Sequence, residues 1–490
     1  MTDRPATAVP GPRKVPPIPT RLEPDAIGAL QDTVLGIANT GPAVSVGLSL
    51  AALAAAAAYA SGPTLILCGI PMVIIANAYR KLNHWNANCG ASFEWVGRTI
   101  SPYLGFLTGW LVIAANLVGN VAAVVVLAPS VLAIFGANAT STWPNIAIAT
   151  AAMLVIIAVV VAGIRPTARV QVALAAVEYV ILVGFAIAGF VAVLGHHAGT
   201  YPVTRSWFSP DGIGGKGDLA AGLLIAVFMY TGWDATVYVN EEVRRRHENP
   251  GRAAIFAVTF VGIFYAVVTM GLQGVVSPAK LQANASSALV YVAQVLAGSG
   301  WAKAMALALA LSVIGGTGAG LVCMARMAYG MASYRALPTV LGRVNPRFST
   351  PAIATIVSGV ILIAATWAYL LSSSLANVFS DVIDTTGLLF GAFYVLTALA
   401  AIAYYRRRIV SNAWDTLLVG ILPLGAAGFL CWIIFRSLQT APAPERWSLA
   451  GIIAAGVILM FVARYILRSS FFEIRREAAE PRSPGSSRDG

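Results

Sequence analysis

Three carboxylates lie inside apolar stretches of this 490-residue sequence, where an ionisable side chain is expensive and is a functional candidate by default. Glu178 lies in VQVALAAVEYVILVGFAI, which holds no basic residue that could pair with it. Asp234 lies in AVFMYTGWDATVYVNEE, and Asp384 lies in VFSDVIDTTGLLFG. A carboxylate in such a place can take up and release a proton or a cation. These residues therefore predict ion binding rather than a covalent reaction.

Each carboxylate also has a structural alternative. Glu178 can be a neutral acid that is hydrogen-bonded to a neighbouring helix, and Asp234 can be a strut that holds an unwound turn. Asp384, like Asp381 one turn away, can cap hydrated polar groups near the membrane surface. We take Glu178 and Asp234 as candidates for proton coupling and Asp384 as a possible part of an outer vestibule.

The composition excludes several classes of protein. Of the residues, 58% are hydrophobic and 11% are charged, whereas a soluble protein carries about a quarter charged residues. The four cysteines show no CxxC spacing and the four histidines fall in polar connections, so we expect no metal centre and no disulfide framework. There is no P-loop to bind ATP, and we expect no cofactor and no enzymatic activity.

The elements that must position these carboxylates are membrane helices. Apolar runs of the length that crosses a bilayer, about 17 to 25 residues, recur along the whole chain. They predict an all-α integral membrane protein with about twelve transmembrane helices over 28–59, 63–79, 104–135, 143–164, 170–194, 219–239, 253–276, 301–324, 352–371, 378–405, 414–435 and 449–466.

The basic residues indicate how these helices are oriented. With both termini in the cytoplasm, 26 of the 32 Lys and Arg residues fall on the cytoplasmic side, as the positive-inside rule requires. The net charge of +12 therefore reflects topology, and nucleic acid is excluded as a partner. We expect a multi-pass protein of the cell membrane, with disordered cytosolic tails at 1–24 and 469–490 around a transmembrane domain at 25–468.

Two of the predicted helices are interrupted in matching positions. The first contains Gly41-Pro42 in LGIANTGPAVSVGLSL, and the sixth contains Gly232 beside Asp234. Proline removes an amide donor and clashes with the preceding turn, and freed backbone groups are tolerated in a membrane only where they line a polar cavity. Such a pair, five helices apart, predicts an inverted-repeat transporter that binds its substrate at the breaks.

Further polar residues have open roles. Asn116 and Asn120 are one helical turn apart, and we favour contacts between helices for both. Ser312 and Thr317 would suit a sodium site, but the presence of Glu178 makes us favour protons over sodium. The pair Glu241 and Glu242 is expected to form an ion-pair cluster with the basic run 244–246, and a purely solvated charge run is the alternative.

Three segments in the same order carry a family resemblance. These are GASFEWVGRTISPYLGFLTGW at 90–110, MYTGWDATVYVNEEVRRRHENPGRA at 229–253 and ARMAYGMASYRALP at 325–338. Together with the predicted spans, they resemble the amino acid-polyamine-organocation (APC) superfamily, of the amino acid permease type, over about residues 25–468.

The resemblance implies a five-plus-five inverted-repeat (LeuT-type) fold with helices one and six broken. The repeats would cover about 28–194 and 218–405, and the helices at 414–435 and 449–466 would be appended. It also implies that the substrate binds at the two breaks, with its carboxylate on amides of the first and its amino group on carbonyls of both. By position, these substrate-binding groups are Thr40, Gly41, Ala43, Val44 and Ser45, opposite Tyr230, Thr231, Gly232 and Trp233.

One residue departs from the family pattern. Pro42 stands in the first break, where the family commonly has a residue with an amide, so the carboxylate cradle loses one donor.

We expect a permease that imports amino acids by alternating access and is driven by protons, with the solute and the lipid bilayer as its partners. A polyamine or organic-cation transporter and an amino-acid or amine exchanger are the alternatives, and a non-transporting nutrient sensor is disfavoured by the short tails.

Overall fold

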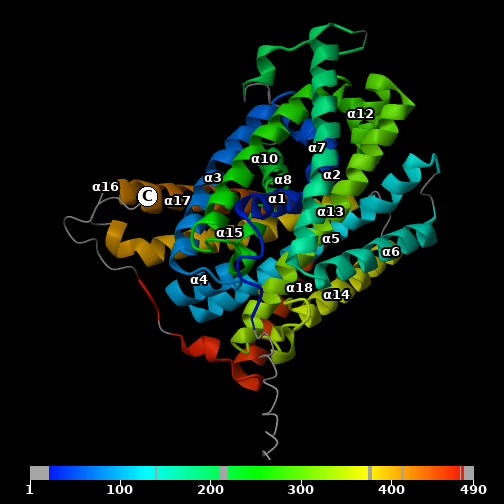
Figure 1. Ribbon diagram of the computed structural model, residues 1–490. Coiled ribbons are helices and arrows are strands. Elements are labelled where there is room, and N and C mark those ends of the chain that lie inside the picture. The colour runs from blue at the N-terminus through cyan, green and yellow to red at the C-terminus, as the bar shows by residue number, and fades with distance from the viewer. Residues whose placement is uncertain are drawn as a thin grey trace, which may run out of the picture.

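The chain folds into a bundle of helices (Figure 1). The computed structural model describes residues 21–137, 141–197, 199–209, 219–372, 378–409, 413–474 and 476–478. Within these ranges there is no β-strand, and two isolated bridges join Ile27 to Val243 and Asn345 to Thr350. The predicted all-helical membrane architecture is confirmed.

Eleven helices in the described ranges are long and apolar enough to cross a bilayer. The first of them is divided into α1 (Ala29–Asn39) and α2 (Pro42–Ala57). The others are α3 (Ser61–Trp85), α5 (Pro102–Ile134), α6 (Thr142–Val161), α7 (Ile164–Leu194), α10 (Asn249–Gln273), α13 (Ser299–Ser333), α14 (Ala352–Ser372), α15 (Val378–Ile409), α16 (Ala413–Asp415) continued by α17 (Leu422–Thr440), and α18 (Ala443–Phe461).

The sequence predicts about twelve spans, and the difference lies in the sixth. There α8 (Leu219–Met229) is a shorter apolar helix, and a turn separates it from α9 (Ala235–Tyr238). Short helices in the connections include α4 (Ala91–Thr99), α11 (Pro278–Ala283) and α12 (Ala288–Ala297). The division of the chain into two inverted repeats stays a prediction.

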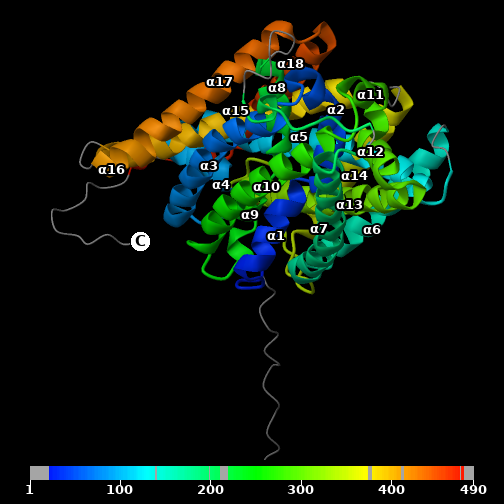
Figure 2. The same ribbon diagram turned by 90° about the horizontal axis from the view of Figure 1, so that it is seen from above.

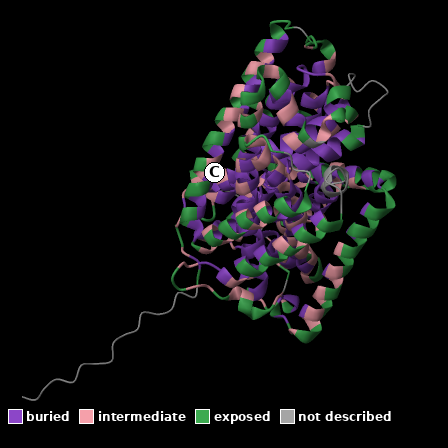
Figure 3. Cartoon of the chain, turned by 90° about the vertical axis from the view of Figure 1, so that its right-hand side faces the viewer, coloured by how far each residue is buried: buried purple, intermediate pink, exposed green. Residues whose placement is uncertain are grey.

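The distribution of buried and exposed side chains is that of a protein surrounded by lipid. Buried residues fill the middle of the bundle and exposed ones lie on its outside (Figure 3). Many exposed residues are large and apolar, such as Trp447 at 76% and Ile458 at 62% exposure on α18, as a surface that faces hydrocarbon requires. Helices α17 and α18 lie along one edge of the bundle (Figure 2).

Both interruptions fall at the residues that the sequence indicates. Gly41 has a left-handed φ of 55°, and Pro42 begins α2 at a first-turn position that needs no N–H. Gly232 has a φ of 103° in the turn after α8. A Cβ atom added to Gly232 would lie 2.6 Å from the carbonyl oxygen of Asn39, so the two breaks are in direct contact.

The expected boundary of the C-terminal tail is wrong. Residues Ser470–Glu473 form a 3₁₀ turn, and the side chain of Phe471 is fully buried. The reason is that Phe471 and Phe472 pack on aromatic side chains of α4 and α5, a contact between distant segments that composition does not reveal. The expected tail residues 1–20 and 479–490 lie outside the described part of the chain.

Candidate functional site

A small cavity lies where the two breaks meet α5, α13 and α15. Its space accessible to water is about 50 Å³. The residues around it come from five segments of the chain: Asn39, Thr40, Gly41, Val44, Ser45, Leu48, Ala115, Asn116, Gly119, Asn120, Ala123, Phe228, Thr231, Ser312, Gly316, Thr386 and Phe390. Of the nine predicted substrate-binding residues, five line this cavity.

The cavity has polar and apolar walls but no charge, since no Asp, Glu, Lys or Arg is among the described residues that line it. Its hydroxyls are turned toward nearby backbone. Thr40 donates to the carbonyl of Ile37 at 2.7 Å, and Thr231 donates to the carbonyl of Phe228 at 2.7 Å. Because these hydrogens are already bound, the two hydroxyls offer a solute lone pairs rather than donors.

The backbone amides of the first break are also bonded inside the protein. Ala43 donates to Oε1 of Glu178 at 2.8 Å, and Val44 donates to Oγ of Ser312 at 3.3 Å. Ser45 donates to the carbonyl of Gly41 at 2.7 Å, and Pro42 has no N–H. In the described conformation, residues 42–45 thus have no amide left for a substrate carboxylate.

Glu178 lies behind the first break rather than in the cavity. It comes from the middle of α7, is 3% exposed, and accepts hydrogen bonds from the Ala43 amide and the Ser312 side chain. Ser312 itself lines the cavity. The side chain of Ser312 therefore lies between Glu178 and the cavity, and Glu178 also contacts the backbone of the first break at Ala43.

Asp234 lies in the turn after α8 and is held by two tyrosines. Tyr238 donates to its Oδ2 at 2.8 Å, and Tyr394 donates to its Oδ1 at 2.9 Å. The amide of Gly232 donates to the Tyr394 hydroxyl at 3.4 Å. Both carboxylate oxygens are therefore bonded, one to Tyr238 of α9 and one to Tyr394 of α15, and Asp234 does not line the cavity, as the strut alternative predicts.

Packed aromatic side chains close one side of the cavity. We call this side the α4 face, because α4 and residues 239–248 lie there; the sequence predicts that it is cytoplasmic. The ring of Trp233 is fully buried and stacks on Tyr394, with ring centroids 5.1 Å apart, and meets Tyr79 edge-on at 5.0 Å. Tyr230 does not line the cavity either, and its hydroxyl donates to the carbonyl of Leu65 at 3.1 Å.

A buried ion pair completes this closed side. Arg326 of α13 donates to both carboxylate oxygens of Glu242, at 3.0 and 3.1 Å, and both side chains are fully buried. The predicted pairing of Glu242 with the basic run 244–246 is wrong, because α13 brings a distant arginine to this carboxylate. Glu241 instead accepts the backbone N–H of Cys89 at 3.0 Å.

The remaining candidates divide between two places. Asn116 and Asn120 line the cavity, and Asn116 also accepts a hydrogen bond from the Asn39 side chain at 3.5 Å. Asp384 borders a separate cavity of about 140 Å³ together with Arg436 and Glu445, and its role in an outer vestibule stays a prediction. Asp381 lies outside the residues whose side chains are described.

Comparison with known proteins identifies the family. A family model described as amino acid permease matches residues 33–461. The chain belongs to the amino acid permease family. The permease is 27% identical over 360 residues to an uncharacterized transporter of Mycobacterium bovis, across 71% of this chain and 76% of the relative. It is therefore a transporter of the APC superfamily, as the sequence motifs predict.

Two relatives with a described solute also match. A methylthioribose transporter of Bacillus subtilis is 24% identical over 467 residues, which are 89% of the permease and 92% of the relative. The Asc-type amino acid transporter 1 of Mus musculus is 24% identical over 295 residues, which are 57% of the permease and 52% of the relative.

Sequence reasoning missed a buried acid in the first broken span of the permease. Asp32 on α1 is fully buried, and neither of its carboxylate oxygens has a hydrogen-bond partner among the described residues. Gly36, one turn later, packs so closely that an added Cβ would lie 2.7 Å from Thr236. The signal in the sequence was an aspartate in the first half of the broken span, nine positions before Gly41.

Proposed function

We propose that this permease imports a small solute that carries an amino group, an amino acid in the first instance, across the cell membrane by alternating access with a proton as the coupling ion. The α4 face is cytoplasmic in this proposal. Its support is the family and one contact, the hydrogen bond from Ala43 in the first break to Glu178. Through this contact, a single carboxylate bears directly on the backbone that shapes the cavity.

The physical argument rests on the charge of Glu178. A hydrogen bond to a carboxylate is roughly twice as strong as one to a neutral acid, so protonation weakens the hold of Glu178 on Ala43. The first break is also tied to the second, because the side chain of Asn39 donates to the carbonyl of Gly232 at 3.1 Å. A proton on Glu178 therefore changes the relative stability of two conformations of both breaks, as coupling requires.

A second candidate is a solute without a carboxylate, such as an amine or an uncharged polar molecule. It is favoured by the internal bonding of the Ala43, Val44 and Ser45 amides and by the absence of charged side chains among the described residues that line the cavity. The Bacillus relative, which matches nearly the full length of the chain, is named for methylthioribose. Such a solute needs acceptors, which the cavity hydroxyls supply.

Uptake into proteoliposomes of the purified permease tests this proposal. A panel of labelled amino acids, amines and uncharged solutes is offered with and without an inward proton gradient, to the wild type and to Glu178→Gln. The matched control is Glu248→Gln, since Glu248 is a partly exposed acid that pairs with Arg252. Accumulation that needs the gradient and is lost only in Glu178→Gln supports the proposal.

The alternatives give different results. Uptake that needs a solute inside the vesicle and ignores the pH identifies an exchanger. Accumulation of amines or uncharged solutes, but of no amino acid, selects the second candidate.

A further inference from the structure

The C-terminal end of the described chain folds back onto the α4 face. Phe471 is fully buried and stacks on Phe93 of α4, with ring centroids 3.9 Å apart. A Cβ atom added to Gly97 would lie 2.2 Å from the Phe471 ring, so the ring packs directly on the backbone of α4. Ser469 donates its hydroxyl to the carbonyl of Tyr334, just after α13, at 2.6 Å. We call residues 469–474 and Glu477 the tail segment.

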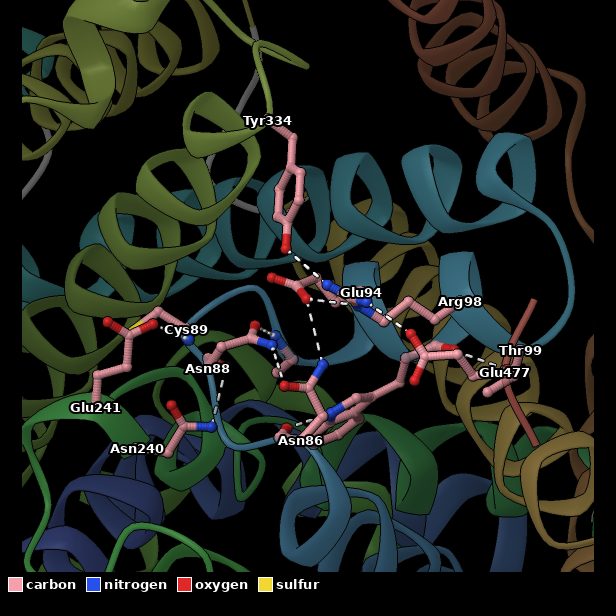
Figure 4. A network of polar contacts seen from close by, with 12 residues as sticks. Asn86, Asn88, Cys89, Glu94, Arg98, Thr99, Asn240, Glu241, Tyr334 and Glu477 are labelled. Atoms are coloured by element: carbon pink, nitrogen blue, oxygen red, sulfur yellow. Dashed lines mark hydrogen bonds and ion pairs between the residues drawn. The ribbon is translucent and has the colours of Figure 1, made fainter. Parts of the chain in front are cut away.

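Arg98 connects the tail segment to two other elements. Its guanidinium donates to Oε1 of Glu477 at 2.8 Å, to the Tyr334 hydroxyl at 3.0 Å and to Oε2 of Glu94 at 3.0 Å (Figure 4). Glu477 also donates its backbone N–H to the Arg98 carbonyl at 2.7 Å. The tail segment is thus bonded to both the side chain and the backbone of Arg98.

The other end of α4 is tied to the exit of the broken sixth span. Oε1 of Glu241 accepts the N–H of Cys89 at 3.0 Å, and the side chain of Asn240 donates to the carbonyl of Asn88 at 2.9 Å (Figure 4). The neighbouring Glu242 is paired with Arg326 of α13. Segment 88–98 is therefore bonded to residues 240 and 241, which stand next to the Glu242–Arg326 pair. If the cavity opens on this side, residues 240–242 must move away from α13.

We propose that the tail segment is a latch that holds the α4 face closed, and that its release accompanies opening of the cavity to that side. Opening requires residues 240–242 to separate from α13, since the buried Glu242–Arg326 pair joins them. Because Asn88 and Cys89, just before α4, are bonded to residues 240 and 241, α4 is drawn along with them. Phe471 and Glu477 oppose this motion by holding α4 to the end of α13. The inference goes beyond the proposed function and depends on neither the solute nor the coupling ion.

The two contacts of the latch differ in strength. The side chains of Arg98 and Glu477 are 24% and 43% exposed, and an ion pair of this kind shifts an equilibrium by about two- to fivefold. Phe471 is the stronger anchor, because its ring is removed completely from solvent. Such a latch holds a closed state without preventing its opening.

Cys89 provides a reporter at the point that the latch protects. It is fully buried beside Glu241, and this burial raises the pKa of its thiol, which slows its reaction with maleimides. With Cys68, Cys323 and Cys431 replaced by alanine, the full-length protein in lipid nanodiscs is treated with N-ethylmaleimide at fixed pH. Modification of Cys89 is then followed by mass spectrometry.

We expect Glu477→Gln to raise the rate of Cys89 modification about two- to fivefold, and Phe471→Ala to raise it about tenfold or more. The matched control is Glu473→Gln, which removes an exposed acid from the same segment and is expected to leave the rate unchanged.

A purely structural tail gives a different result. Melting temperatures that fall in both variants, with Cys89 modified at the parent rate, would overturn the proposal. If Phe471→Ala does not fold, Glu477→Gln decides alone, and an unchanged rate counts against the latch. Solute uptake by the parent protein is measured separately, so a failure of the proposed transport function is distinguishable from a failure of the latch.

Discussion

Ala43 donates its backbone N–H to Glu178 over 2.8 Å, so the first break is bonded to α7 rather than left open to a solute. Ser312 extends this contact, because it accepts the N–H of Val44 and is hydrogen-bonded to Glu178. The cavity and the candidate coupling site therefore share one wall.

Ser312→Ala removes the hydroxyl that connects the Val44 amide with Glu178. We expect it to weaken solute binding by about 1 kcal/mol, the loss of one buried hydrogen bond, which raises the KM for uptake about fivefold. The control is Ser49→Ala, since Ser49 is buried on α2 and its hydroxyl has no partner among the described residues. A KM that rises equally in both variants would show that Ser312 has no special role.

Tyr394→Phe separates two functions of the turn after α8. The hydroxyl of Tyr394 contacts both Asp234 and the Gly232 amide, whereas that of Tyr238 contacts Asp234, Ser92 and Tyr79 rather than the backbone of the break. Both Phe variants are expected to lower stability by about 1–3 kcal/mol, because Asp234 loses a partner. Only Tyr394→Phe is expected to slow uptake, since it also removes the hydrogen bond to the Gly232 amide in the second break. Melting curves and uptake rates measure the two effects, and equal uptake rates would argue against the distinction.

The Arg326–Glu242 pair is expected to be strongly coupled. Arg326→Met or Glu242→Gln alone removes one charge and leaves the other buried without a partner. Each single variant should therefore destabilise the protein by about 3–5 kcal/mol. The double variant should recover much of this loss, because neither charge then remains. Thermal unfolding of the four proteins in detergent forms a double-mutant cycle, and additive losses would mean that the two side chains act independently.

Asp32→Asn tests the acid that the sequence did not single out. An unpartnered buried carboxylate is unfavourable for folding, so we expect this variant to melt at a higher temperature than the wild type. If Asp32 takes part in proton movement, uptake falls at the same time. Asp25→Asn is the control, since Asp25 is exposed near the start of α1. A variant that melts lower would show that the carboxylate has a stabilising partner.

Local patterns were sufficient to predict the membrane fold and the two breaks. Apolar runs of membrane length and the pair Gly41-Pro42 act within a few residues, where backbone sterics decide the structure. The resemblance predicts nine substrate-binding residues at the two breaks, and five of them line the cavity: Thr40, Gly41, Val44, Ser45 and Thr231.

The partners of the buried charges could not be predicted in the same way. Glu242 meets Arg326 and Phe471 meets Phe93 across 84 and 378 positions of sequence, and a single sequence carries no signal for such pairs. The resemblance implies that Trp233 binds the substrate, but the turn directs its ring toward Tyr394 and away from the cavity lining. Side-chain direction within an unwound segment depends on packing rather than on periodicity.

Proton movement with the solute tests the central claim most directly. Proteoliposomes with a trapped pH-sensitive dye and no imposed gradient receive a solute that the wild type accumulates. We predict that solute entry acidifies the lumen of wild-type vesicles, while Glu178→Gln vesicles exchange solute without a change of pH. Acidification at the wild-type rate in Glu178→Gln vesicles would contradict the account, because the proton would then travel without the carboxylate that contacts Ala43.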